Sequence, residues 1–157
     1  MDELKVVNIR LVKEPSLYSE KRLETPKAVL EFMAEEMAAY DREILCVLNL
    51  KSNCQVINMN IVSVGCINAT IVSPREVFKS AILSNASGMI ALHNHPSGSI
   101  RPSREDVRVT RQLIKGGRIM GIELMDHIIV GGTSGEMYSF REERREMFLE
   151  REDELER

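Results

Sequence analysis

Cysteine is scarce in this sequence, and its spacing does not suggest a disulfide framework. The three cysteines, Cys46, Cys54 and Cys66, lie in or near apolar stretches and form no CxxC pair. We therefore expect buried free thiols in a reducing compartment, with a redox role as the minor alternative. The sequence also lacks an apolar run near the ~18 residues that a membrane helix needs, and it shows no N-terminal charged-then-apolar signal. These absences predict a cytoplasmic protein without a membrane segment.

A strong excess of either charge is also missing. The formal net charge is -3, and the segment 141–157 holds five arginines against eight acidic residues, which accounts for all of it. The rest of the chain is balanced, so a strongly basic nucleic-acid surface is not indicated. Basic side chains do cluster locally, at Arg101, Arg104, Arg108, Arg111 and Lys115. We favour a solvated helix face for this cluster over a site for an acidic partner group.

Length and hydrophobic content fit one compact domain of the mixed α/β class. The chain has 157 residues, 43% of them hydrophobic, which is enough to bury a core. Stretches of strand length alternate with segments of helical periodicity. The predicted strands are 5–11, 43–50, 55–64, 89–92 and 123–130, with a hairpin turn at 51–54. The predicted helices begin at Pro26, at Pro74 and just after Ser103, and the last ends near Gly116-Gly117 or Gly121.

The densest group of polar side chains follows the apolar residues 90–92. His93 and His95 are separated by one residue, and Asp106 follows after a loop rich in Pro, Gly and Ser. Side chains at i and i+2 of an extended backbone point to the same face, so both imidazoles can face one point from a strand end. Asp106 falls in the first turn of a helix that Ser103 is expected to cap. Two nitrogens and one carboxylate oxygen would leave a tetrahedral zinc ion one open position, which is typical of a catalytic site.

A simpler interpretation applies to the same residues. Asp106 could be a helix-start carboxylate that the helix dipole favours, and His93 and His95 could be ordinary polar residues of a loop. For a lone HxH pair the two interpretations have comparable weight. The fixed interval to Ser103 and Asp106 favours the metal site.

The string from His93 to Asp106 resembles the JAMM metalloprotease motif, also called JAB or MPN-plus, in which HxH is followed by seven residues, Ser, two residues and Asp. Residues 96–102 are the seven, and the match has no gap. Over about residues 25–140 the sequence is similar to the bacterial RadC-like JAB domain. The stretches that carry this similarity are 74–78, 93–98, 102–103 and 126–131. The loop centre Ser99-Ile100-Arg101 departs from the usual Asp-Pro-Thr kind of triplet, but no position of the metal motif is lost.

The resemblance implies a JAB/MPN-like fold, with a curved central sheet flanked by helices in cytidine-deaminase-like layering, and a bound Zn²⁺. It also implies an upstream glutamate as general base, and Glu43, at the start of an apolar strand, falls in that place. Glu76 is the competing candidate, but Ser73, Pro74 and Glu76 form a capping-box pattern, so we assign Glu76 a structural role. The resemblance gives Ser103 the role of oxyanion donor, which we weigh equally with its role as a helix N-cap.

Two functions from different classes follow. The first is a zinc metallohydrolase, a peptidase or isopeptidase that acts on a peptide or isopeptide substrate. The second is a binding module accessory to DNA repair, recombination or mobile elements, in which zinc is structural or vestigial. A nucleobase deaminase would need HxE and PCxxC, and neither occurs. Neither the physiological substrate nor the oligomeric state is indicated.

We divide the chain into an N-terminal strand and linker at 1–24, the RadC-like domain at 25–140 and a charged extension at 141–157. The extension is expected to be a solvated helix or a frayed end, and the short N-terminal segment predicts a stand-alone JAB domain. Residues 131–135 lack the Lys-Ser/Thr of a phosphate loop and are expected to form a turn. Asp126 and His127, directly before the apolar residues Ile128, Ile129 and Val130 of the last predicted strand, are candidates to support the zinc histidines.

Overall fold

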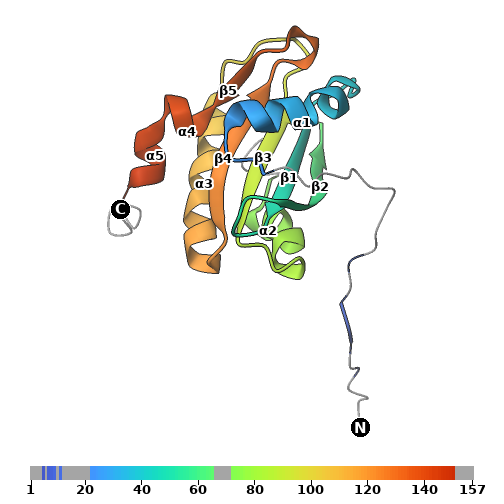
Figure 1. Ribbon diagram of the computed structural model, residues 1–157, viewed down its shortest axis with the longest axis vertical. Helices are drawn as coiled ribbons and strands as arrows, with labels where there is room; N and C mark the ends of the chain where they lie inside the picture. Colours follow the sequence, from blue (N-terminus) through green and yellow to red (C-terminus); the bar gives the residue numbers. More distant parts are fainter. Residues whose placement is uncertain (1–4, 6, 10, 12–21, 66–71, 151–157) are drawn as a thin grey trace.

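A computed structural model describes residues 5, 7–9, 11, 22–65 and 72–150 as a mixed α/β fold, which confirms the predicted class. In chain order the elements are α1 (Pro26–Ala38), β1 (Ile44–Leu50), β2 (Val56–Val64), α2 (Pro74–Leu83), β3 (Gly88–Asn94), α3 (Arg104–Met120), β4 (Glu123–Val130), the 3-10 turn η1 (Gly132–Ser134), β5 (Met137–Ser139), α4 (Phe140–Glu143) and α5 (Arg145–Leu149). Figure 1 shows the sheet with α1 crossing in front of it.

The five strands form one sheet in the order β2-β1-β3-β4-β5. Strand β1 is antiparallel to β2 and β3, β4 is antiparallel to β5, and only β3 and β4 are parallel. A parallel pair needs a crossover connection, which the loop after β3 and helix α3 provide. Because β1 and β3 are antiparallel, the beginning of β1 lies beside the end of β3, and Leu45 faces His93 in the register. The topology thus brings Glu43 to the edge where the two histidines lie.

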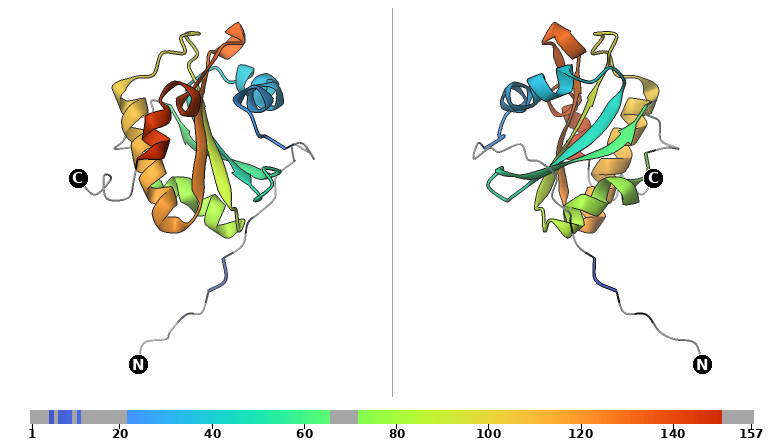
Figure 2. Two further views of the ribbon diagram at one scale, coloured as in Figure 1. Left: turned by 60° about the vertical axis from the view of Figure 1, so that its left-hand side comes forward. Right: turned by 90° about the vertical axis from the view of Figure 1, so that its right-hand side faces the viewer.

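Helices cover both faces of the sheet, as the two views of Figure 2 show. One apolar cluster joins the sheet to α2 and α3 and includes Leu45, Val47, Ala91, Ile129, Val77, Phe78, Val109 and Leu113. The other joins the sheet to α1 and includes Cys46, Leu48, Leu92, Ile128, Val29, Met33 and Met37. Consecutive strand residues alternate between these clusters, as the period of two requires. Strands β1 and β3 are buried along their whole length, which explains their continuous apolar runs.

The helix ends follow the local signals in the sequence. The Thr25 side chain accepts a hydrogen bond from the Ala28 N–H at 3.1 Å, and Pro26 occupies the first turn of α1. Helix α3 ends at Met120, and Gly121 follows it with a φ of 70°, in the left-handed region that glycine adopts without strain. The expected hairpin turn joins β1 to β2, where the Cys54 N–H donates to the Lys51 carbonyl at 2.9 Å. Residues 131–135 form the expected turn around η1.

The structure describes two of the three cysteines that we predicted to be buried free thiols. Cys46 is buried and free, and burial raises the pKa of its thiol to about 12. Cys54 is free and half-buried, so it is more accessible than expected. Cys66 lies outside the described residues. No helix in the described ranges is long and apolar enough to cross a membrane.

Two local predictions are wrong. Within the range expected to form a strand at 5–11, residues 5, 7–9 and 11 belong to no strand and are exposed. Alternation alone does not make a strand, because a strand also needs a hydrogen-bonded neighbour. The capping box expected at α2 does not form either. Ser73 occupies the N-cap position without a side-chain cap, and the Glu76 carboxylate instead pairs with Lys79 at 2.9 Å.

The described beginning of the charged extension, residues 141–150, is largely helical and mostly exposed, as expected for a solvated helix, but one side of it is packed and is not frayed. Phe140, the residue just before the extension, is fully buried, and Met147 on α5 is only 2% exposed in the apolar cluster that α3 also joins. The Arg118 guanidinium donates to the Phe148 carbonyl at 3.1 Å, which ties α5 to α3. A few apolar side chains therefore dock this segment although most of its residues are charged. Residues 151–157 of the predicted extension lie outside the described ranges.

Candidate metal centre

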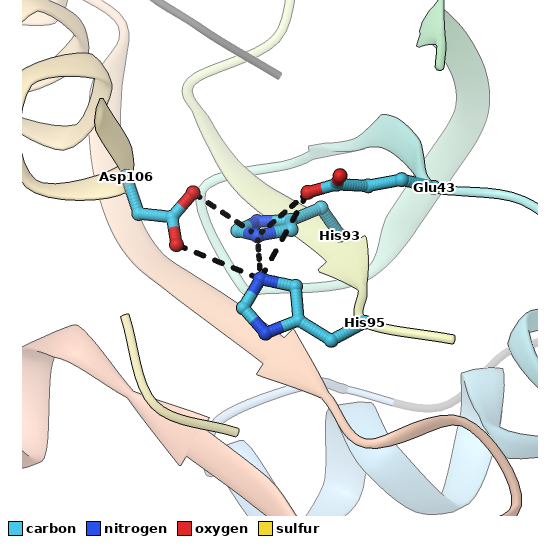
Figure 3. A group of neighbouring side chains, drawn as sticks. All are labelled: Glu43, His93, His95 and Asp106. Carbon is cyan, nitrogen blue, oxygen red and sulfur yellow. Dashed lines mark hydrogen bonds and ion pairs between the residues drawn. The ribbon is translucent and has the colours of Figure 1, made fainter. Parts of the chain in front are cut away.

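Four side chains from three separate parts of the chain converge at one edge of the sheet (Figure 3). They are Glu43 from the start of β1, His93 and His95 from the end of β3, and Asp106 from the first turn of α3. One potential ligand atom from each lies within 4.8 Å of all the others. This group could hold a metal ion, and it contains each of the predicted ligands and the predicted base.

The two histidines supply the centre of the group. His93 lies at the end of β3 on the face that α3 covers, and His95 follows two residues later on the same side. Their Nε2 atoms are 2.9 Å apart. The His93 Nε2 lies 3.3 Å from Asp106 Oδ1, and the His95 Nε2 lies 3.5 Å from Asp106 Oδ2. Both rings therefore present the same nitrogen to one carboxylate.

Asp106 is fixed by the start of α3. Ser103 accepts a hydrogen bond from the Asp106 N–H at 3.0 Å, and its own N–H donates to Asp106 Oδ2 at 2.7 Å, which forms a capping box. Burial alone would raise the pKa of Asp106, but the two histidine rings and the Ser103 N–H outweigh it and hold that pKa well below its usual range. The N-cap role expected for Ser103 is thus observed, and the lowered pKa of the carboxyl group beside it favours the ionised form.

Asn94, the residue between the two histidines, holds the backbone on either side of Glu43. Its side chain is fully buried, accepts from the Ile44 N–H at 2.7 Å and donates to the Arg42 carbonyl at 3.0 Å. Sequence reasoning missed this residue. Its position was a usable signal, because the middle residue of HxH must point away from the histidines.

Glu43 lies at the more open side of the group. Its Oε1 is 3.7 Å from the His93 Nε2 and 3.8 Å from the His95 Nε2, and its side chain is 27% exposed, whereas that of Asp106 is 2% exposed. Glu43 therefore reaches both the candidate ligands and the solvent. Glu76, the candidate set aside from the sequence, is not a member of the group.

The outer ring nitrogens of the two histidines also have partners. His95 Nδ1 lies 2.7 Å from the Ser99 carbonyl oxygen. His93 Nδ1 lies 2.8 Å from the Nε2 of His127, whose Nδ1 lies 2.6 Å from the Thr110 hydroxyl. His127 is completely buried, and this burial lowers the pKa of its ring well below the ordinary value. Sequence reasoning missed Thr110, although a threonine four residues after a ligand lies on the same helix face.

The predicted supporting pair divides into two roles. His127 contacts His93, as expected, but Asp126 contacts neither His93 nor His95. Its carboxylate instead accepts from the Ser139 hydroxyl at 2.6 Å and from the backbone N–H groups of His127 and Arg141. Burial raises the pKa of Asp126 despite these bonds. Asp126 therefore joins β4 to β5 and α4.

The side-chain atoms that meet in this group are suitable ligands for a metal cation. A carbonyl oxygen can only accept a hydrogen bond, so a neutral His95 ring that bonds the Ser99 carbonyl must carry its hydrogen on Nδ1. The Nε2 of His95 then has a lone pair. Asp106 and Glu43 add carboxylate oxygens, which are acceptors as well. Such a convergence of acceptors is repulsive unless a cation or a proton lies among them. Asp106 accordingly raises the pKa of His95, because it attracts a proton to this space.

Comparison with known proteins assigns most of the chain to a family. The family model described as RadC-like JAB domain matches residues 23–146. The chain belongs to the RadC-like JAB domain family. Among similar proteins are UPF0758 proteins of Syntrophomonas wolfei, 46% identical over 122 residues, and of Symbiobacterium thermophilum, 49% identical over 117 residues. A UPF0758 protein of Methanosarcina mazei is 41% identical over 132 residues.

These alignments cover most of this chain but only about half of each relative. They include 78%, 74% and 84% of this chain, respectively, and 49%, 49% and 55% of the three relatives. The chain thus spans about half the length of the relatives that it matches. The match shows the family of this domain, and the structure shows its possible metal group. Because only about half of each relative is matched, no activity of the complete relatives is assigned to this chain.

Proposed function

We propose that this RadC-like JAB domain is a zinc-dependent metallohydrolase that cleaves an amide bond, as a peptidase or isopeptidase. The convergence of Glu43, His93, His95 and Asp106 within 4.8 Å carries this proposal. Two imidazole nitrogens and a carboxylate oxygen suit zinc, and three protein ligands leave a position open for catalysis. In this proposal His93, His95 and Asp106 hold the ion.

The two remaining residues, Glu43 and Ser103, have separate roles in this proposal. Bound zinc supplies a Lewis acid that polarises a carbonyl and lowers the pKa of water toward neutrality. Glu43 accepts a proton from the attacking water and passes it to the leaving amine, a role that suits a carboxylate with one side open to solvent. Ser103 donates a hydrogen bond from its hydroxyl group to the substrate oxygen as negative charge develops there, and it keeps its proton. The N-cap uses only a lone pair of Ser103, so the two roles are compatible.

The first test separates ligands from base. We expect about one zinc per chain by metal analysis, and we expect His95→Ala to abolish it. Glu43→Gln should bind zinc as the wild type does, because Glu43 is not a ligand in this proposal. Zinc binding as strong in His95→Ala as in the wild type would refute the site, and a large loss of affinity in Glu43→Gln would make Glu43 a ligand.

The second test addresses the reaction. The zinc-loaded domain is incubated with a proteome-derived peptide library, and new amino termini are read by mass spectrometry. We expect cleavage that a chelator abolishes and that is at least about a hundredfold slower in Glu43→Gln, since a general base contributes roughly 10²–10⁴-fold. Equal cleavage by wild type and Glu43→Gln would remove Glu43 as the base. The absence of cleavage in this library and in an isopeptide-linked substrate set would contradict the peptidase proposal.

One feature favours a second candidate function, a nucleic-acid-binding module. The outer face of α3 exposes Arg104, Arg108, Arg111 and Lys115, and a depression beside it is lined by Arg104, Arg108 and Arg144. Acidic residues partly neutralise this face, since Arg108 pairs with Glu105 at 3.2 Å and Arg111 with Glu150 at 3.8 Å. A reducing compartment, for which we propose the cytoplasm, suits either function.

This candidate predicts binding of an oligonucleotide that weakens steeply with salt. Replacing Arg104 and Arg144 together by Ala should weaken it, whereas Lys79→Ala on α2 should not. Binding that is absent at low salt, or equal in all variants, would refute the candidate.

A further inference from the structure

The candidate ligand His93 is the last member of a chain of side-chain contacts that begins inside helix α3. The Thr110 hydroxyl lies 2.7 Å from the Asp106 carbonyl oxygen and 2.6 Å from the His127 Nδ1. The other nitrogen of His127, Nε2, lies 2.8 Å from the His93 Nδ1. The remaining nitrogen of His93 faces Asp106, Glu43 and His95. These contacts are buried, since Thr110, His127 and His93 are each 0% exposed.

The direction of each of these hydrogen bonds is determined by the one before it. A backbone carbonyl has no hydrogen, so Thr110 donates its single hydroxyl proton to Asp106. The Thr110 oxygen can then only accept from His127, which therefore carries its hydrogen on Nδ1. A neutral imidazole has one N–H, so the Nε2 of His127 accepts from the His93 Nδ1. When the His93 ring is neutral, its Nε2 is then left with a lone pair.

The packing around His127 favours the neutral ring that this reasoning needs. The ring stacks on Phe140, with centroids 4.9 Å apart and planes 10° from parallel. Within the described part of the chain, the hydrogen-bond partners of its two nitrogens are Thr110 and His93, neither of them a carboxylate. A buried cation without an anionic partner is unfavourable.

The opposite arrangement would obstruct the candidate metal centre. If His127 carried its hydrogen on Nε2, it would donate to His93 Nδ1, and a neutral His93 would carry its own hydrogen on Nε2. That hydrogen would point at the space shared with Asp106 and His95, where a metal ion would have to bind. Within this series of hydrogen bonds, it is the Thr110 hydroxyl that excludes a His127 ring with its hydrogen on Nε2.

We propose that Thr110 and His127 are positioning residues that hold His93 in the tautomer able to bind a metal through Nε2. The inference rests on the proposed metal site, but it describes the metal-free protein and can be tested there. It assigns a task to a buried threonine and a buried histidine that are not members of the metal group. Neither residue touches substrate in this proposal.

The direct test is the tautomer of each ring in the metal-free wild-type protein. The chain has three histidines, so two-bond ¹H–¹⁵N correlation spectra can be assigned with one His95→Gln variant and one His127→Gln variant. We expect the Nδ1–H form for both His93 and His127, although an unconstrained neutral imidazole prefers Nε2–H. An Nε2–H form of His93 or of His127 in the wild type would overturn the inference without recourse to any other variant.

Variants of Thr110 provide the second test. Thr110→Val keeps the shape and removes the hydroxyl, so we expect both rings to shift toward Nε2–H and zinc affinity to fall on the order of 10- to 100-fold. Thr110→Ser keeps the hydroxyl and should keep the wild-type tautomers and affinity. Thermal unfolding of both variants, followed by circular dichroism, controls for loss of the fold. A folded Thr110→Val with wild-type tautomers and affinity would refute the inference.

The outcomes separate this inference from the proposed function. If the wild type has the expected tautomers but binds no zinc, the metal proposal fails and the hydrogen-bond chain is correct. If the wild type binds zinc through His95 and Asp106 but Thr110→Val binds equally well, the metal site is correct and the positioning role is wrong.

Discussion

Asn94→Ala should loosen the backbone that carries Glu43. Asn94 is fully buried and accepts from the Ile44 N–H at 2.7 Å, just beyond the last paired residues of β1 and β3. Ile44 is only 5% exposed, so in the variant its N–H loses its acceptor away from water. Leaving a buried donor unsatisfied costs about 1–3 kcal/mol. The lost hydrogen bond to the Arg42 carbonyl adds little to this free-energy cost, because Arg42 is exposed and water can replace the Asn94 donor.

The loss of unfolding free energy in Asn94→Ala can be measured by urea unfolding and by thermal unfolding, both followed by circular dichroism. In a thermal scan, a loss of about 2 kcal/mol should lower the midpoint by roughly 4–8 °C for a chain of this size. Hydrogen exchange gives the local readout, because the Ile44 amide should lose more protection than the global loss of stability explains.

A second buried asparagine provides the control for this prediction. Asn49 is also fully buried on β1, and its amide donates to Asn58 at 2.7 Å and to Ser80 at 3.0 Å, far from Glu43 in the strand. Asn49→Ala should also destabilise the fold, but the Ile44 amide should then lose only as much protection as the whole domain. If both variants change Ile44 exchange in proportion to global stability, the reasoning on Asn94 is wrong.

Two further predictions concern pH and the C-terminal helix. Asp106 raises the pKa of His95 above 6.5, so in the metal-free protein this pair stabilises the fold below about pH 6.5 and the stabilisation is lost as pH rises through the folded pKa. Because zinc competes with that proton, the zinc-induced rise in thermal midpoint should grow over the same interval; a rise that shrinks would contradict this. Met147→Ala should cost about 2–3 kcal/mol in urea unfolding, because Met147 is 2% exposed and a terminal helix can partly relax. Leu149→Ala, with Leu149 66% exposed, should cost almost nothing, and equal losses would refute the docking of α5.

Elements with strong local signals were predictable to within two residues. The predicted strand 123–130 is the observed β4, and the helices after Thr25 and Ser103 begin where the caps indicate. These signals are local, since a cap satisfies N–H groups within one turn. The predicted strand 89–92 was too short, because β3 also includes His93 and Asn94, whose polar side chains ended the apolar pattern.

Errors arose where a pattern had more than one way to be satisfied. The Ser73 and Glu76 pattern permits a capping box, but Lys79, one turn further on, offers Glu76 an ion pair. The charged residues after Phe140 suggested a solvated or frayed end, and most of them are exposed, but Met147 and the partly buried Phe148 dock α5 on the core. Composition averages over a segment, whereas docking depends on the few residues that face the core.

The sequence by itself determined the chemistry of the candidate centre: two histidines that an extended backbone turns to one side, and an aspartate that the cap at Ser103 fixes in the first turn of a helix. The tertiary structure decided which distant residues complete it. Glu43 reaches the histidines because β1 runs antiparallel to β3, and His127 reaches His93 because β4 runs parallel to it. Strand pairing joins residues that are far apart in the chain, and neither spacing nor periodicity along the sequence encodes which strands will be neighbours.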